Sequence, residues 1–113
     1  MRKIDKPWGH ELIWAETEKY VGKILHIRRG FCLSLQYHNA KDETVLVQSG
    51  ILTLEIGDNS SRQVCKLNPG ESCHIPPGAI HRMSASDGDV DVVEVSTPEL
   101  NDIVRLEDRY GRV

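Results

Sequence analysis

The chain has 113 residues, of which 39% are hydrophobic and 27% are charged, and its formal net charge is −3. This length suits one domain covering residues 1–113, because it can bury a single hydrophobic core but has no room for a second. The slightly negative charge gives no reason to expect nucleic acid or an anionic membrane as a partner. No apolar run approaches the roughly 20 residues of a membrane span, and residues 1–7 lack the apolar core of a secretion signal, so we expect a cytoplasmic protein.

Short apolar or alternating runs recur along the chain and predict β-strands. In chain order these runs are residues 11–15, 20–28, 32–38, 44–48, 51–56, 63–67, 72–75, 81–85 and 90–95. The segments between them are rich in Gly, Pro, Asn and Asp, which supply the backbone conformations of turns. Such a pattern predicts an all-β sandwich or jelly-roll barrel with little helix. The best helix candidate is residues 98–105, with Thr97 as N-cap and Pro98 as first residue.

Both ends of the chain carry large apolar side chains that are costly to leave in water. These are Trp8, Ile13, Trp14, Ile103, Val104 and Leu106. We expect them to cover the barrel or a neighbouring subunit. A homodimer is the expected assembly, because a small barrel gains stability when its edge strands are covered.

Four polar residues form the candidate metal site. Gln36 and His38 are two residues apart on a predicted strand, so their side chains project from the same face. Glu43 follows the turn-like segment 39–42, and His81 comes from a distant hairpin. Imidazole nitrogens with carboxylate or amide oxygens suit one divalent ion among zinc, manganese, iron, cobalt and nickel, and spacing does not choose among these.

The spacing of these residues resembles the two signature motifs of the cupin superfamily. The first motif is matched at Gly30, Gln36, His38, Glu43 and Gly50, and the second at Gly70, Pro76, Gly78 and His81. The chain departs from the usual pattern at Gln36, where His is more common, and at Ala85, where Asn is common. The resemblance implies a cupin jelly-roll β-barrel, or double-stranded β-helix, with Gln36, His38, Glu43 and His81 as metal ligands.

A narrower resemblance is to the type II mannose-6-phosphate isomerases. It is carried by residues 6–9, by residues 33–38 and by residues 102–112. Gln at the first ligand position is normal in that group. The similarity covers only the isomerase portion of bifunctional enzymes that also carry a nucleotidyltransferase domain, so that second activity is not implied. The chain differs beside the metal site, where Lys41 replaces Arg, and Thr44 and Val45 replace His and Trp.

Basic residues are the candidates for substrate contact. Lys23 matches a Lys of the isomerase pattern, and it would be catalytic or substrate-binding if it faces the barrel interior, which alternation leaves open. Arg105, Arg109 and Arg112 could clamp a phosphate, for which the planar guanidinium group is suited. The alternative is that acidic neighbours neutralise them on a solvated face. The resemblance favours Arg109 and Arg112 as substrate-binding, with Arg109 also catalytic.

Two classes of function follow. The first is a metal-dependent aldose–ketose isomerase that converts mannose 6-phosphate to fructose 6-phosphate, with the ion acting as a Lewis acid and a base that the sequence does not identify. The second is a non-catalytic cupin that binds a metal and a sugar or sugar phosphate as an accessory or regulatory protein. A cupin enzyme acting on another small molecule is a further alternative, because a fold does not determine a function.

Overall fold

The computed structural model describes residues 1–113 and consists of strands joined by turns and loops, without a helix. The strands are β1 (Arg2–Lys6), β2 (Gly9–Glu16), β3 (Val21–Ile27), β4 (Leu35–Tyr37), β5 (Glu43–Ser49), β6 (Leu52–Gly57), β7 (Arg62–Leu67), β8 (Ser72–Ile75), β9 (Ile80–Ser84), β10 (Val90–Ser96) and β11 (Val104–Glu107). No helix is long and apolar enough to span a membrane.

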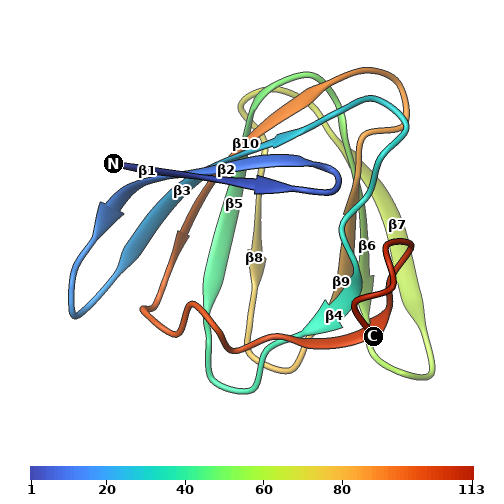
Figure 1. The fold of residues 1–113 in the computed structure, drawn as a ribbon. Helices are drawn as coiled ribbons and strands as arrows, with labels where there is room; N and C mark the ends of the chain where they lie inside the picture. The colour runs from blue at the N-terminus through green and yellow to red at the C-terminus, as the bar shows by residue number, and fades with distance from the viewer.

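The strands form two antiparallel sheets that face each other (Figure 1). The six-stranded sheet has the order β1-β2-β3-β10-β5-β8, and the five-stranded sheet has the order β11-β4-β9-β6-β7. Neighbours within a sheet are mostly distant in sequence, so the chain repeatedly crosses from one sheet to the other. These crossings bring side chains from both sheets together in the space between them.

Alternation along the strands decides which side chains fill that space. In β10, Val90 and Val92 are completely buried, whereas Val95 on the opposite face is half exposed. The buried hydrophobic core is a cluster of Trp8, Leu25, Ile27, Val45, Val47, Leu52, Leu54, Ile75, Met83, Ala85, Val90 and Val92. Burying such side chains away from water is the main force that holds the two sheets together.

The all-β architecture and each of the predicted strand positions are confirmed, with bounds shifted by a few residues. Strands β1 and β11 were not predicted. Near the termini, Trp8 and Ile13 are buried, but Trp14 and Leu106 are 47% and 40% exposed. Trp14 and Leu106 therefore do not pack in the core, and their contact with a neighbouring subunit stays a prediction.

The helix predicted for residues 98–105 is wrong. Thr97 does not cap a helix, because its hydroxyl accepts a hydrogen bond from the backbone nitrogen of Asp42. The backbone makes only short-range bonds there, such as Asp102 N to Glu99 O at 3.3 Å, and then extends into β11. Antiparallel pairing of β11 with β4 satisfies backbone groups at the end of this segment in place of a helix.

Candidate metal centre

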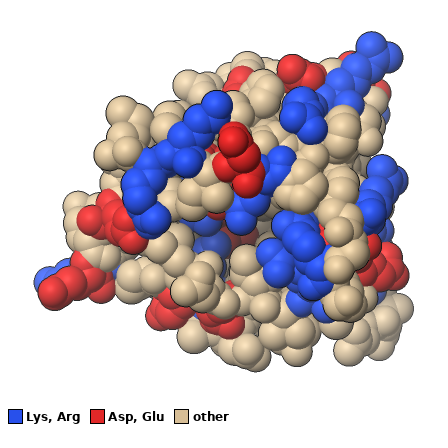
Figure 2. Space-filling view, viewed as in Figure 1, with Lys and Arg blue, Asp and Glu red and all other residues tan.

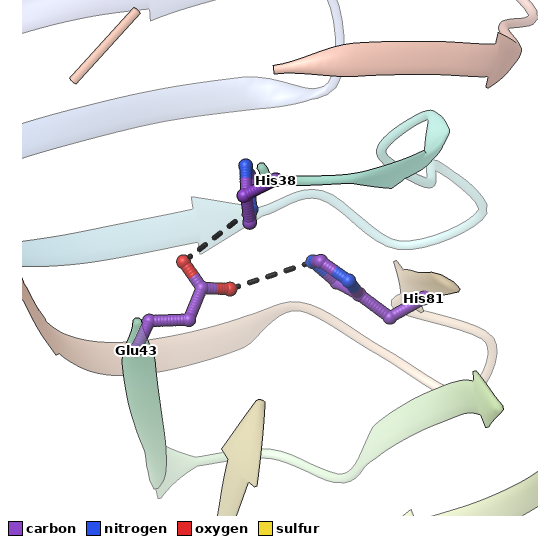
Figure 3. Close-up of side chains that lie close together, drawn as sticks. All are labelled: His38, Glu43 and His81. Carbon is purple, nitrogen blue, oxygen red and sulfur yellow. Dashed lines mark ion pairs between the residues drawn. The ribbon is translucent and has the colours of Figure 1, made fainter. Parts of the chain in front are cut away.

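His38, Glu43 and His81 meet in the interior between the two sheets (Figure 3). Their ligand atoms all lie within 4.8 Å of one another. His38 Nε2 is 3.6 Å from Glu43 Oε2, and His81 Nε2 is 3.4 Å from Glu43 Oε1. Each of the three side chains is about 1% exposed. The cluster is therefore shielded from bulk water and could hold one ion.

The fold explains why these residues converge. Gln36 of β4 pairs with His81 of β9, so the two side chains lie on the same face of the five-stranded sheet. His38 follows β4 directly, and Glu43 is the first residue of β5 in the other sheet. The chain crosses between the sheets in the few residues that separate His38 from Glu43, which places the carboxylate opposite the two imidazoles.

The second ring nitrogen of each histidine fixes which nitrogen faces the centre. His38 Nδ1 lies 2.5 Å from the carbonyl oxygen of Asp102, and His81 Nδ1 lies 3.0 Å from that of Ala79. A carbonyl oxygen only accepts hydrogen bonds, so each Nδ1 carries a proton and donates it. Each Nε2 then presents a lone pair to the Glu43 carboxylate. This is the arrangement that metal-binding histidines adopt.

The atoms that face the centre have no hydrogen-bond partner in the protein. They are Nε2 of His38, Nε2 of His81 and both carboxylate oxygens of Glu43, of which only Oε2 has a charged neighbour, the Lys41 ammonium at 2.9 Å. Each buried polar atom left without a partner costs about 1–3 kcal/mol, and a lone pair aimed at a carboxylate is repulsive. A divalent cation at the centre would satisfy all four atoms at once, so the residues present fit a metal ion.

The charge state of Glu43 also suits a ligand. Burial by itself raises the pKa of Glu43. Two effects lower this pKa and outweigh burial: hydrogen bonds from His38 and His81 when their rings are doubly protonated, and the positive charge of the Lys41 ammonium. The pKa of Glu43 therefore lies well below its usual range. Lys41 Nζ is 2.9 Å from Glu43 Oε2, so the carboxylate stays ionised and anionic.

Gln36, the remaining predicted ligand, lies beside the cluster. It is 8% exposed, and its side chain shares a face with His81 across the β4–β9 pair. Its Oε1 accepts a hydrogen bond of 2.6 Å from Ser34 Oγ, which leaves a second lone pair on that oxygen. Its role as a ligand stays a prediction.

Asp102 supports the cluster and was not singled out from the sequence. Its carboxylate accepts hydrogen bonds from the backbone nitrogens of Asn39, Ala40 and Lys41, at 3.0, 2.7 and 2.9 Å. These bonds lower the pKa of Asp102 to about 2. Together with its carbonyl bond to His38, they hold the loop between β4 and β5. No local signal identifies this contact, because the partners are more than 60 residues apart.

A charged pocket adjoins the metal cluster. Its lining includes Glu11, Lys23, Gln36, Lys41 and Glu94. Its volume is about 40 Å³, which is room for about three water molecules. Figure 2 shows Lys and Arg side chains around a hollow near the centre of the face, with acidic atoms among them. The pocket is thus narrow, polar and lined by both signs of charge.

Buried ion pairs organise this pocket. Lys41 Nζ lies 3.2 Å from Glu94 Oε2 in addition to its contact with Glu43. Lys23 Nζ lies 3.3 Å from Glu11 Oε1. Burial raises the pKa of Glu94, the Glu43 charge raises it further, and Lys41 opposes both. Burial lowers the pKa of Lys41, but Glu94 and Glu43 outweigh that effect and raise it, so Lys41 remains a cation.

Glu11, Lys41 and Glu94 are site residues that the sequence reasoning missed or noted only as a departure from the family pattern. A usable signal existed for Glu94, since alternation along 90–95 places it on the same face as the buried Val90 and Val92. A carboxylate in register with two buried valines indicates an interior charged site.

The structure places two of the three predicted substrate-binding residues in the pocket and the third outside it. Lys23 faces the interior, is 6% exposed and lines the pocket. Arg112 also lines it, and its Nε pairs with Asp108 Oδ2 at 2.8 Å. Arg109 is exposed and lines a separate depression with Cys32 and Ser84. Its position gives the predicted catalytic and substrate-binding roles of Arg109 no support.

Comparison with known proteins shows which sequences this chain resembles. Residues 1–108 match the family described as "Mannose-6-phosphate isomerase C-terminal". The chain is 35% identical over 117 aligned residues to the mannose-1-phosphate guanylyltransferase ManC of Salmonella typhimurium, covering 99% of this chain and 23% of that protein. The chain spans about a quarter of the length of the curated relatives it matches.

Solved structures confirm the fold. KdgF from Halomonas sp. superposes with a TM-score of 0.76 at 21% identity, covering 90% of this chain and 92% of that one. A protein of Klebsiella pneumoniae with a double-stranded β-helix domain gives a TM-score of 0.73 at 21% identity, covering 94% and 85%. The cupin jelly-roll implied by the sequence motifs is therefore the fold of this chain.

Proposed function

The chain belongs to the mannose-6-phosphate isomerase C-terminal family, and from this premise we propose that it is a metal-dependent isomerase of an aldose phosphate. Mannose 6-phosphate and fructose 6-phosphate are the first substrate pair to test. The observation that carries the proposal is the set of four inward-facing ligand atoms of His38, Glu43 and His81 without hydrogen-bond partners. Gln36 is the proposed fourth ligand.

The proposed cofactor is one divalent ion, which would be zinc, manganese, cobalt, nickel or iron. When bound, it supplies Lewis-acid stabilisation of negative charge on the substrate oxygens. Two imidazoles, one carboxylate and one amide leave open positions for those oxygens. The anionic Glu43 offsets one of the two positive charges of the ion.

The isomerisation itself moves two protons and needs no redox partner. One proton leaves C2 and is delivered to C1, while the hydroxyl proton of O2 is transferred to O1. Glu94 is the carboxylate best placed to carry a proton, because it lines the pocket, is not needed as a metal ligand and shares the Lys41 ammonium with the proposed ligand Glu43. Burial raises its pKa, which brings a carboxylate closer to the range of an effective general base at neutral pH.

Lys23 is proposed to contact the substrate from the neighbouring strand. Its ammonium is buried and balanced by Glu11, so it can donate to a sugar oxygen without adding an unpaired charge to the pocket. Lys41 is proposed to hold Glu43 and Glu94 in position through its two short contacts. The proposed partner is therefore a small sugar phosphate, and homodimerisation and a cytoplasmic location remain predictions.

The narrow pocket favours a second candidate, a non-catalytic cupin that binds a metal and a sugar or its phosphate. A volume of about 40 Å³ is well below the roughly 300–1,000 Å³ of typical small-molecule pockets, so substrate entry requires the lining side chains to move apart. A protein whose pocket opens too little for turnover would retain the metal and bind only part of a ligand.

The test combines elemental analysis with an assay of mannose 6-phosphate conversion. The variants are His38→Ala and His81→Ala, with His74→Ala as the control, because His74 is an exposed histidine outside the cluster. We expect about one metal ion per chain in the parent and the control, and loss of both metal and turnover in the two variants. Metal without turnover of mannose 6-phosphate or of a panel of other aldose phosphates would refute the isomerase and leave the binder, whereas a parent protein without metal would refute both.

A further inference from the structure

Arg105 lines the pocket and forms no ion pair with any carboxylate of the chain. Three other cations of the lining form ion pairs, Lys23 with Glu11, Lys41 with Glu43 and Glu94, and Arg112 with Asp108. Arg105 forms no ion pair, and its Nε is buried without a hydrogen-bond acceptor. A buried guanidinium nitrogen without an acceptor is costly. The acceptor of this nitrogen is therefore supplied by water or by a bound ligand.

Asp108 does not fill this role. Its two oxygens accept hydrogen bonds from the Nε and a terminal nitrogen of Arg112, at 2.8 and 2.9 Å. Those bonds lower the pKa of Asp108 to about 2, and Arg105 contributes to the lowering only through its charge. Lys6, the remaining cation of the lining, also has no ion-pair partner, so Arg105 and Lys6 are the two cations of the pocket that are free to meet an anionic ligand.

Strand pairing aligns Arg105 with the metal cluster. Arg105 of β11 pairs with Gln36 of β4, and Gln36 pairs with His81 of β9. The three residues thus form one row across adjacent strands, on the face that lines the pocket and the cluster. Adjacent strands are about 4.8 Å apart, so the two ends of the row are separated by about 10 Å. That span suits a small molecule with its reacting carbons at one end and an anionic group at the other.

We infer that Arg105, assisted by Lys6, binds the anionic group of the substrate, and that this group is a phosphate monoester. The planar guanidinium fork donates two parallel hydrogen bonds to an oxyanion. A carboxylate offers the same chemistry, so the experiment includes both. The choice of a phosphate monoester rests on the proposed function, whereas binding of an oxyanion at Arg105 rests on the geometry alone.

The test is a calorimetric titration of the purified protein with mannose 6-phosphate, glucuronate and mannose, with metal content measured in each sample. The variants are Arg105→Gln and Arg105→Lys, and Arg109→Gln is the control because Arg109 is exposed at a separate depression. We expect Arg105→Gln to weaken binding of mannose 6-phosphate by about 10- to 100-fold and to leave binding of mannose unchanged. Arg105→Lys keeps the charge without the fork and should fall between the parent and Arg105→Gln.

The inference is overturned if the parent binds mannose and mannose 6-phosphate equally, or if Arg109→Gln weakens binding as much as Arg105→Gln. Tighter binding of glucuronate than of mannose 6-phosphate would overturn the assignment to a phosphate monoester. If Arg105→Gln does not fold, the test is whether inorganic phosphate competes with mannose 6-phosphate for binding to the parent protein. Failure to compete would refute the inference. Binding through Arg105 without turnover would refute the proposed reaction and leave this inference standing.

Discussion

Removal of the Lys41 ammonium is the sharpest test of the buried charge network. Lys41 is 3% exposed, and its Nζ lies 2.9 Å from Glu43 and 3.2 Å from Glu94. Lys41→Met keeps most of the side-chain volume but leaves Glu94 as a buried carboxylate without its ion-pair partner. Breaking a buried ion pair on one side costs about 3–5 kcal/mol, which is a large part of the roughly 5–15 kcal/mol that stabilises a domain.

We therefore expect Lys41→Met to lower the melting temperature by about 12–20 °C, since 1 kcal/mol shifts Tm by about 4 °C in a domain of this size. Lys41→Arg retains the charge and is the matched control. The double variant Lys41→Met/Glu94→Gln should recover part of the loss, because it removes the stranded charge as well. The measurement is the Tm and the free energy of unfolding by denaturant titration, at a fixed metal concentration.

The pH dependence gives a second readout of the same variant. Burial and Glu43 hold the folded-state pKa of Glu94 above its usual value, and loss of Lys41 raises it further. A raised carboxyl pKa means that the protonated, neutral form is favoured in the folded state, so stability is greatest below the unfolded pKa and falls as pH rises through the folded pKa. The deficit of Lys41→Met should therefore shrink as pH falls from 7 to 5. A loss below about 1 kcal/mol, or a deficit independent of pH, would refute the network.

Two further predictions concern the loop and the core. Hydrogen bonds from the backbone nitrogens hold the pKa of Asp102 at about 2, below the unfolded value, so the stability it contributes is present above about pH 4 and is lost as pH falls towards 2. Asp102→Asn should flatten that acid limb in a series of melting curves, and an unchanged limb would show that the loop contact contributes nothing. Ile75 is fully buried in the core, so Ile75→Ala should cost about 2–5 kcal/mol in denaturant unfolding. Val95→Ala is the control, because Val95 is 50% exposed, and equal losses for the two would contradict the assignment of the core.

The period-2 pattern explains why much of the site could be predicted from the sequence. Gln36 and His38 were assigned to one face because alternate residues of a strand point the same way, and the pairing of Gln36 with His81 places Gln36 beside one of the two histidines of the cluster. The turn-like residues before Glu43 indicated that the chain reverses there. His81, however, was joined to the others only through resemblance to the cupin motifs, because no local rule relates two strands that are more than 40 residues apart.

The three C-terminal arginines show where sequence reasoning stops. Arg105, Arg109 and Arg112 were equivalent as phosphate-binding candidates, and family resemblance favoured the last two. The structure places Arg105 on a strand paired with β4, ties Arg112 to Asp108, and leaves Arg109 at a separate depression. This distinction results from the pairing of strands that are far apart in the sequence. It could not be predicted from a helix at residues 98–105.

The sequence by itself determined nine of the eleven strands, the turns between them and the residues with metal-ligating chemistry, because alternation and turn propensity are local properties of the chain. Only the tertiary structure decided which charges meet inside the barrel. The contacts of Lys41 with Glu94, of Asp102 with the loop after β4, and of Arg105 with the row through Gln36 depend on strands brought together from distant parts of the chain. The free energy of a buried charge depends on its partners and its exposure to water, and neither is set until the sheets have packed.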